Sequence, residues 1–168
     1  QFGISICTID GQRYNIGDTN IYFTVQSCCK PINYGIVLEE LGEEEVHKFV
    51  GREPSGKSFN ELTLNKEGKP HNPLINSGAI MTSSLIKNKS NHADRFDSIM
   101  NIWKQLSGGI YKIGFNNSVY LSEKTTADRN YALAYFMKET NDKKKIGFPE
   151  NTKLDETMEL YFQCCSIE

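Results

Sequence analysis

Apolar and polar residues alternate along the start of the chain, a pattern that is typical of β-strands. The alternation begins at Ile4, stops at the tight turn Asp10-Gly11, and returns through Tyr14 and Ile16. A third run of β-forming residues covers positions 21–25. The pattern therefore predicts three antiparallel strands of one sheet within residues 1–25.

The apolar spacing then changes to every three or four positions, which predicts helices. The expected helices cover about residues 27–41, 43–50, 73–86, 92–106, 128–140 and 154–168. Asn72 is expected to cap the third of these helices and Asn91 the fourth. The helix 128–140 is apolar on most sides, so we expect it to be central and buried. Residues 51–70 are rich in Gly, Pro, Ser and Asn and predict a long loop, while Lys143-Lys144-Lys145 predicts a short solvated one.

The order of these elements, strands first and helices afterwards, predicts an α+β fold. An antiparallel sheet whose one face is covered by helices leaves its other face and an edge open. The last helix also reaches position 168 without a Gly or Pro stop signal. We therefore expect one incomplete domain over residues 1–168, mainly helical over 27–168 and truncated at both ends.

Composition excludes several classes of function. Hydrophobic residues make up 38% of the chain, enough for a folded core. The 19 basic and 21 acidic residues give a net charge of −2, so the chain has no basic surplus to neutralise a nucleic-acid backbone. No apolar run approaches the roughly 20 residues of a membrane span.

The chain has five cysteines, and four of them form two adjacent pairs. They are Cys7, Cys28, Cys29, Cys164 and Cys165. No C-x-x-C motif occurs and the three histidines are widely spaced, so the spacing predicts no metal site. Adjacent cysteines seldom build a disulfide framework, and we expect reduced thiols that serve as small buried hydrophobic residues.

The candidate for chemistry is the Ser-x-x-Lys sequence from Ser27 to Lys30, where the strand pattern changes to the helix pattern. One helical turn places the lysine near the serine hydroxyl, and the helix N-terminus supplies N–H groups for developing negative charge. A partly desolvated lysine could then accept the serine proton. A plain N-cap serine remains an alternative. A second copy, Ser84 to Lys87, lies late in a helix, where no free N–H groups are expected.

Ser-x-x-Lys enzymes that recognise penicillin also carry Ser-Asp-Asn and Lys-Thr-Gly motifs. Neither motif occurs in this chain, and Asp128-Arg129-Asn130 is the segment nearest to the first.

Several short segments in the same order resemble the serine-dependent glutaminases, in particular the animal kidney- and liver-type enzymes. These segments are Gln26-Ser27-Cys28-Cys29-Lys30-Pro31, Pro70-His71-Asn72-Pro73 with Asn76-Ser77-Gly78-Ala79-Ile80, Ser122-Glu123 with Asp128-Arg129-Asn130, and Tyr161-Phe162-Gln163-Cys164-Cys165-Ser166-Ile167-Glu168. The resemblance covers essentially the whole chain.

The resemblance implies a β-lactamase-like fold, shared with penicillin-binding proteins, and hydrolysis of L-glutamine to L-glutamate and ammonia. Ser27 would be the nucleophile that forms an acyl-enzyme, and Lys30 would activate it. The residues that match substrate-binding positions, besides Ser27 itself, are Gln26, Asn76, Glu123, Asn130 and Tyr161. A carboxylate such as Glu123 can pair with the α-ammonium group of glutamine. Amide and hydroxyl groups can donate hydrogen bonds to the α-carboxylate of glutamine. Four of these residues also have a structural interpretation. Asn76 could be a polar residue on a helix face, Glu123 a surface charge, Asn130 a residue of a first helical turn and Tyr161 a core aromatic residue.

The resemblance further implies no cofactor, phosphate as a possible activator, a homotetramer, and a mitochondrial location, with the cytoplasm as the alternative. The family's other site tyrosines and its second oxyanion donor have no counterpart in this chain, so little turnover is expected from these residues alone. Two alternatives stay open. One is another Ser-x-x-Lys acyl hydrolase of the penicillin-recognising type, and the other is a non-catalytic binding or assembly fragment.

Overall fold

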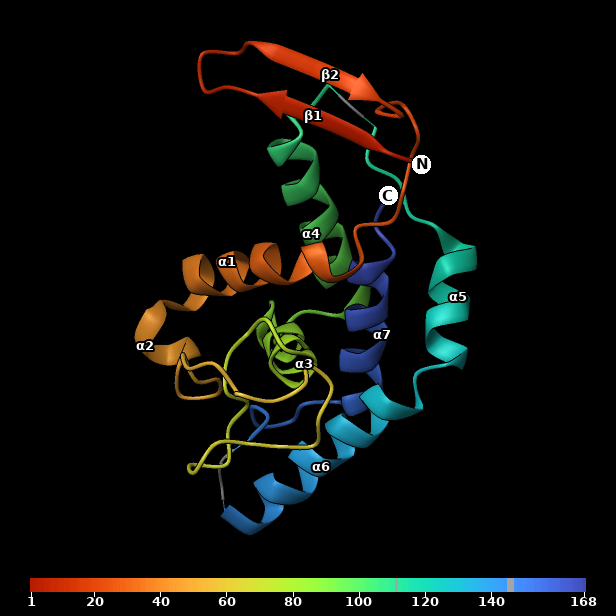
Figure 1. Ribbon diagram of the computed structural model, residues 1–168. Coiled ribbons are helices and arrows are strands. Elements are labelled where there is room, and N and C mark those ends of the chain that lie inside the picture. Colours follow the sequence, from red (N-terminus) through yellow and green to blue (C-terminus); the bar gives the residue numbers. More distant parts are fainter. Residues whose placement is uncertain (111, 145–146) are drawn as a thin grey trace.

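The computed structural model describes residues 1–110, 112–144 and 147–168. A β-hairpin lies at one end of the molecule, and a body of helices lies below it (Figure 1). The helices are α1 (Cys29–Leu41), α2 (Glu43–Val46), α3 (Asn76–Leu85), α4 (His92–Leu106), α5 (Asn117–Thr125), α6 (Asp128–Lys144) and α7 (Leu154–Cys165). Within the described ranges, no helix is both long enough and apolar enough to cross a membrane.

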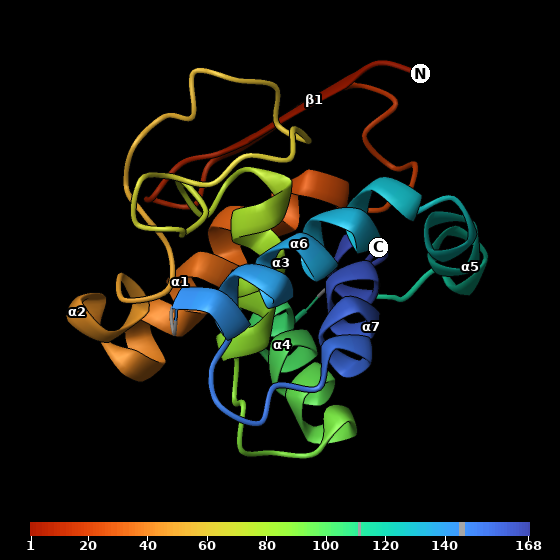
Figure 2. The same ribbon diagram turned by 90° about the horizontal axis from the view of Figure 1, so that it is seen from below.

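Helix α3 is the centre of the helical body, where α1, α6 and α7 pack around it (Figure 2). All residues of α3 from Ser77 to Leu85 are buried. The expectation that 128–140 is the central helix is wrong, because α6 buries Leu133, Ala134 and Met137 but exposes Tyr135. The short side chains at the start of α3 explain the difference, since they allow neighbouring backbone to approach closely.

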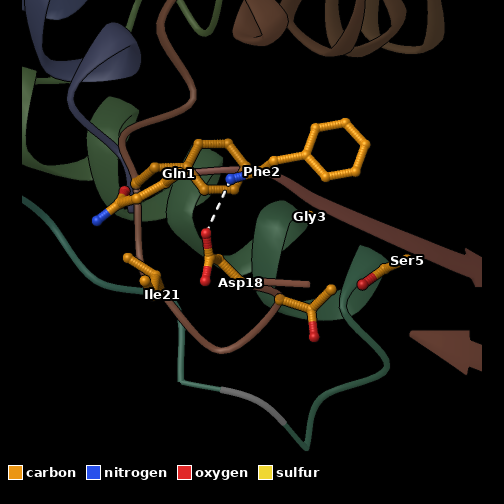
Figure 3. Close-up of a pocket in the computed structure, with 8 residues that line it drawn as sticks. Gln1, Phe2, Gly3, Ser5, Asp18 and Ile21 are labelled. Atoms are coloured by element: carbon orange, nitrogen blue, oxygen red, sulfur yellow. Dashed lines mark hydrogen bonds between the residues drawn. The ribbon is translucent and has the colours of Figure 1, made fainter. Parts of the chain in front are cut away.

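The hairpin pairs β1 (Gly3–Cys7) with β2 (Arg13–Gly17) in antiparallel register, so that Gly3 lies opposite Gly17. Gly11, with φ of 89°, supplies the left-handed residue of the turn. At the open end the Phe2 N–H donates to Asp18 Oδ2 over 2.8 Å (Figure 3). All residues of both strands are exposed. The first two predicted strands are therefore confirmed.

The third predicted strand is wrong. Residues 21–25 run as irregular chain from the hairpin to the helical body (Figure 1). Their last residue, Val25, donates its N–H to Ile167 O over 2.8 Å rather than to the hairpin. No strand pairs with this segment among the described residues, and β propensity without a partner does not make a strand.

The boundaries of two helices agree with the sequence signals. Gly42, with φ of 80°, ends α1 as expected. Asn91 accepts a hydrogen bond from the Asp94 N–H over 2.9 Å and so caps α4. The second helix, expected over 43–50, is shorter and ends at Val46.

The start of α3 lies later than the Asn72-Pro73 signal predicts. Asn72 Oδ1 accepts from the N–H groups of Leu74 and Ile75, at 3.0 and 3.2 Å, and so closes a turn that precedes the helix. Helix α3 itself begins at Asn76. This turn places the Asn72 carbonyl so close to Gly78 that a Cβ there would lie 1.8 Å from the oxygen.

Helix α5 is absent from the expected elements, because it buries no residue and carries a weak apolar pattern. Its one clear signal is Asn116, whose side chain accepts from the Val119 N–H over 3.0 Å.

Helix α6 runs on to Lys144, so the solvated loop expected there is wrong for Lys143 and Lys144. Lys145 lies outside the described residues.

Helix α7 ends at Cys165 rather than continuing to residue 168. The following Ile167 forms an antiparallel bridge with Phe115. Glu168 and Gly114 exchange two backbone hydrogen bonds, of 2.7 and 3.0 Å. Backbone pairing with a distant segment therefore ends this helix, in place of a Gly or Pro signal.

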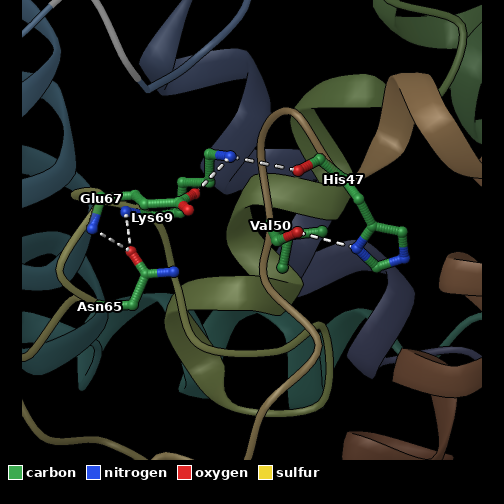
Figure 4. Close-up of polar contacts among 5 residues, drawn as sticks. All are labelled: His47, Val50, Asn65, Glu67 and Lys69. Atoms are coloured by element: carbon green, nitrogen blue, oxygen red, sulfur yellow. Dashed lines mark hydrogen bonds and ion pairs between the residues drawn. The ribbon is translucent and has the colours of Figure 1, made fainter.

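Residues 51–70 form the predicted long loop, without helix or strand. Asn65 Oδ1 accepts from the N–H groups of Glu67 and Lys69, at 3.0 and 2.9 Å (Figure 4). The Lys69 ammonium forms an ion pair with Glu67 at 2.8 Å and donates to His47 O at 3.3 Å. Gly51 N–H donates to Pro70 O over 2.8 Å and closes the base of the loop. The loop is thus held by its own polar side chains.

Candidate active site

Ser27 lies in a single 3-10 turn, η1 (Gln26–Cys28), which leads directly into α1. The serine is exposed, and the residue before it, Gln26, has φ of 48°. A non-glycine residue in this left-handed region carries strain, which proteins often store at functional sites. The sequence pattern placed Ser27 at a change from strand to helix, whereas the structure has irregular chain before the turn.

Lys30 lies one turn further on and is buried, with 5% of its surface exposed. Its ammonium donates to Asn76 Oδ1 over 2.7 Å, and Asn76 Nδ2 donates to Asn130 Oδ1 over 3.0 Å. These three residues come from the first turns of α1, α3 and α6. Three helix N-termini, each the positive end of a helix dipole, therefore meet around one lysine.

Burial lowers the pKa of Lys30, because the ammonium form loses its hydration. The nearby Cys165 and Cys29 act in the opposite direction. Its hydrogen-bond partner Asn76 is a neutral amide, which does not hold the proton as a carboxylate would. The site therefore favours a lysine that can give up its proton and act as a base.

Tyr161 projects from α7 and is 5% exposed. Burial raises the pKa of Tyr161, and the charges of Cys165, Cys29 and Glu123 add to the effect. The phenol therefore stays protonated and available as a hydrogen-bond donor. Its interaction with Glu123, a half-buried residue of α5, brings this carboxylate within electrostatic reach of the same region.

Gln26 stands beside the predicted nucleophile in the chain, but its side-chain amide donates to Thr24 Oγ1 over 3.1 Å. The structure thus joins Lys30, Asn76 and Asn130 by direct hydrogen bonds. Tyr161 and Glu123 interact electrostatically. The Gln26 side chain is hydrogen-bonded to Thr24, two residues before it in the chain.

The second Ser-x-x-Lys sequence has a structural role. Ser84 is buried within α3 and its hydroxyl donates to the Met81 carbonyl over 2.6 Å. Its position late in a helix, expected from the sequence, is therefore confirmed.

The cysteines differ from the expectation of five buried hydrophobic residues. Cys7 and Cys28 are exposed, while Cys29, Cys164 and Cys165 are buried. Cys29 and Cys165 lie 3.9 Å apart between their Sγ atoms, beside Lys30 and Tyr161. Sequence reasoning missed this pair, because no local signal connects two cysteines that are 136 residues apart.

Comparison with known proteins gives a consistent result along the whole chain. The family described as Glutaminase matches residues 1–168. The chain is 48% identical over 167 residues to the liver isoform of mitochondrial glutaminase from Rattus norvegicus, and 41% identical over 167 residues to a glutaminase from Microcystis aeruginosa. Each match covers 99% of this chain, but 27% of the rat protein and 46% of the Microcystis protein.

A solved structure gives the same result. The crystal structure of a Bacillus glutaminase superposes with a TM-score of 0.85 at 34% identity, over 98% of this chain and 53% of that one. The α+β class and the β-lactamase-like fold are therefore confirmed. Because the sequence and the fold match along essentially all of its length, the chain belongs to the glutaminase family.

Proposed function

We propose that this chain carries the serine and lysine of a glutaminase site that hydrolyses L-glutamine to L-glutamate and ammonia. The observation that carries the proposal is the hydrogen-bonded series Lys30–Asn76–Asn130 one turn from an exposed Ser27. The lowered pKa of Lys30 supports its role as the base. Full-length relatives are longer than this chain, which spans about a quarter of the rat protein and about half of the bacterial ones.

In the proposed reaction, Ser27 Oγ attacks the carbon of the glutamine side-chain amide and its proton passes to the neutral amine of Lys30. The helix N-terminus behind Ser27 stabilises the negative charge on the amide oxygen. The tetrahedral intermediate then expels ammonia, which takes the proton from Lys30, and leaves a γ-glutamyl ester on Ser27. Water hydrolyses the ester and releases L-glutamate.

The remaining residues suit the two charged groups of an α-amino acid. The Glu123 carboxylate pairs with the α-ammonium of glutamine. The amides of Asn76 and Asn130 and the protonated phenol of Tyr161 donate to its α-carboxylate. Gln26 lines the pocket beside Ser27 once its amide leaves Thr24.

The cellular location, the oligomeric state and the activator of the enzyme belong to the same proposal. The rat relative is named as a mitochondrial protein, which favours mitochondria over the cytoplasm for this one. The family resemblance supports a homotetramer, phosphate as an activator, and no cofactor.

The proposal predicts that Ser27→Ala in the full-length protein lowers ammonia release from L-glutamine by about 10⁴-fold or more. Because Ser27 is exposed, the free energy of unfolding should change by less than about 0.5 kcal/mol. The measurement is coupled detection of ammonia beside urea unfolding. Ser84→Ala is the matched control, since it removes the serine of the other Ser-x-x-Lys sequence, and it should keep its activity.

Equal activity in Ser27→Ala and the wild type would contradict the assignment. Hydrolysis of nitrocefin without hydrolysis of glutamine would favour the penicillin-recognising alternative. Glutamine binding without ammonia release by the wild type would favour a non-catalytic binding module.

A further inference from the structure

Two buried thiols meet directly behind the candidate active site. Cys29 on α1 and Cys165 on α7 are 136 residues apart in the sequence, and their Sγ atoms lie 3.9 Å apart. Their exposed fractions are 1% and 5%. The proposed hydrolysis gives neither thiol a role.

We propose that Cys29 and Cys165 form a redox-sensitive pair that hydrogen peroxide converts into a disulfide between α1 and α7. A disulfide needs the two sulfur atoms about 2 Å apart. The thiols are already in contact, and side-chain rotation with a small helix shift brings them together. Ser27, two residues before Cys29, is exposed, so peroxide has a short distance to pass from this surface to thiols that are 1% and 5% exposed.

The chemistry has two balanced steps. The Cys165 thiolate attacks one peroxide oxygen, the O–O bond breaks, and the leaving hydroxide takes a proton to form water. This step oxidises Cys165 to a sulfenic acid. The Cys29 sulfur then attacks Cys165 Sγ, the S–O bond breaks, and the hydroxyl leaves with the Cys29 proton as a second water. Overall, two thiols and one peroxide give one disulfide and two waters.

The charged and polar groups beside the pair favour Cys165 as the attacking thiol. The hydrogen bond between the two thiols lowers the pKa of Cys165, and the Lys30 charge and the Tyr161 hydroxyl add to this effect. Burial and the Glu123 carboxylate act in the opposite direction. The same hydrogen bond raises the pKa of Cys29, which fits the second, resolving role. Thiolate character at one member of a contacting pair is what such oxidation requires.

The neighbouring cysteines do not share this arrangement. Cys164 is fully buried, and burial raises its pKa to about 12. Cys28 is exposed at the surface of the η1 turn. Each Cys-Cys doublet therefore supplies one cysteine of the proposed disulfide. The adjacent cysteine, Cys28 or Cys164, serves as the control.

The disulfide has a consequence for the site, and this step rests on the proposed function. It would link the residue before Lys30 to the residue one turn after Tyr161. Closing 3.9 Å to about 2 Å combines side-chain rotation with a small shift of α1 against α7. Misplacement of catalytic groups by about 1 Å costs up to roughly 100-fold in rate, so the oxidised enzyme should be about 10- to 100-fold slower.

The primary test is peptide mapping of the full-length protein after peroxide treatment and alkylation of free thiols. Trypsin leaves Cys28 and Cys29 on one peptide, residues 14–48, because the Lys30-Pro31 bond resists cleavage. It leaves Cys164 and Cys165 on a peptide that begins at Leu154. We expect these two peptides to become linked, and fragmentation of the linked species in the wild type should assign the bond to Cys29 and Cys165.

The matched variants separate the four thiols. Cys29→Ala and Cys165→Ala should each lose the link, whereas Cys28→Ala and Cys164→Ala should keep it. Fragmentation of the wild type decides the point even where a variant fails to fold. Absence of the link in the wild type, or its persistence in Cys29→Ala, would overturn the proposal.

The activity assay is kept separate from the mapping. Peroxide should slow ammonia release by wild type, dithiothreitol should restore it, and Cys29→Ala should be insensitive to both. A link that forms in a protein without glutaminase activity in either state would overturn the proposed function alone. Glutaminase activity without any link would overturn the redox pair alone.

Discussion

At the scale of single residues, the hydrogen-bond partner of Lys30 affects how readily this lysine loses its proton, as the proposed base must do. The ammonium donates to Asn76 Oδ1 at 2.7 Å, and a neutral amide stabilises the charged form less than a carboxylate would. Burial therefore keeps the pKa of Lys30 below its usual value. The base must be unprotonated to accept the Ser27 proton, so activity should rise with pH as Lys30 loses its proton.

Asn76→Asp tests this relation. A carboxylate at the same distance favours the ammonium and should raise the pKa of Lys30 by about 1–3 units. The ascending limb of kcat/KM for glutamine should then move to higher pH by a similar amount, whatever happens to the absolute rate. The measurement is the pH profile of ammonia release.

Asn88→Asp is the matched control, because Asn88 is exposed in the connection between α3 and α4. It should leave the ascending limb in place. A limb that stays unmoved in Asn76→Asp would show that Lys30 does not set the pH dependence.

Sequence reasoning reached these residues by different routes. The Ser-x-x-Lys spacing singled out Ser27 and Lys30, because the two lie within one helical turn. Nothing local connects Lys30 with Asn76, 46 residues away, and only the family resemblance pointed to that asparagine. The contact between Cys29 and Cys165 was missed for the same reason, since each doublet by itself is typical of small buried residues.

At the scale of elements, helix α3 requires a residue without a side chain at position 78, because neighbouring backbone packs closely against it. A Cβ on Gly78 would lie 1.8 Å from Asn72 O and 2.9 Å from the Cα of Pro73. Real Cβ atoms do not approach backbone so closely, so either the turn or the helix must move. The same turn precedes Asn76, and the close packing therefore also positions a candidate site residue.

Gly78→Ala should lower the free energy of unfolding by about 2–4 kcal/mol, the upper range of over-packing costs. It should also weaken activity, because Asn76 moves with the start of α3. Gly35→Ala is the matched control in α1, where a Cβ meets nothing within 4 Å. Alanine is the better helix former, so this control should stabilise the protein by up to about 1 kcal/mol. Urea unfolding measures both changes, and equal effects of the two substitutions would refute the steric argument.

Two helix ends with a local signal were predicted correctly, whereas a segment without a strand partner and a helix without a buried face were not. Gly42 and Asn91 mark helix ends by their own backbone or side-chain chemistry, and both boundaries are confirmed. The β-forming residues 21–25 lack a neighbouring strand in the described structure, and their final N–H binds Ile167 instead. Helix α5 buries none of its residues, so no apolar periodicity revealed it, although Glu123 lies on it.

At the scale of the whole molecule, the candidate site exists only when the helices are assembled. Its residues come from η1, α1, α3, α5, α6 and α7, and they are joined by contacts between segments far apart in the chain. The loop 51–70 takes part as well, because Phe59 O accepts from the Asn76 N–H over 3.1 Å. An unfolded chain offers none of this arrangement, so a ligand of the site should bind the native state alone and stabilise it.

The corresponding prediction uses the Ser27→Ala variant of the full-length protein, which should bind L-glutamine without consuming it. At 100 times its Kd, a ligand specific for the native state adds about 2.7 kcal/mol to the free energy of unfolding. The Tm should therefore rise with the concentration of glutamine. Adding Glu123→Gln to the same variant removes the carboxylate proposed to pair with the substrate ammonium, and the rise at equal glutamine concentration should largely disappear. Glu44→Gln, at an exposed position of α2, is the matched control and should leave the rise intact. A glutamine-dependent rise of equal size with and without Glu123 would exclude this carboxylate from substrate recognition, since the assembled helices would then bind glutamine without it.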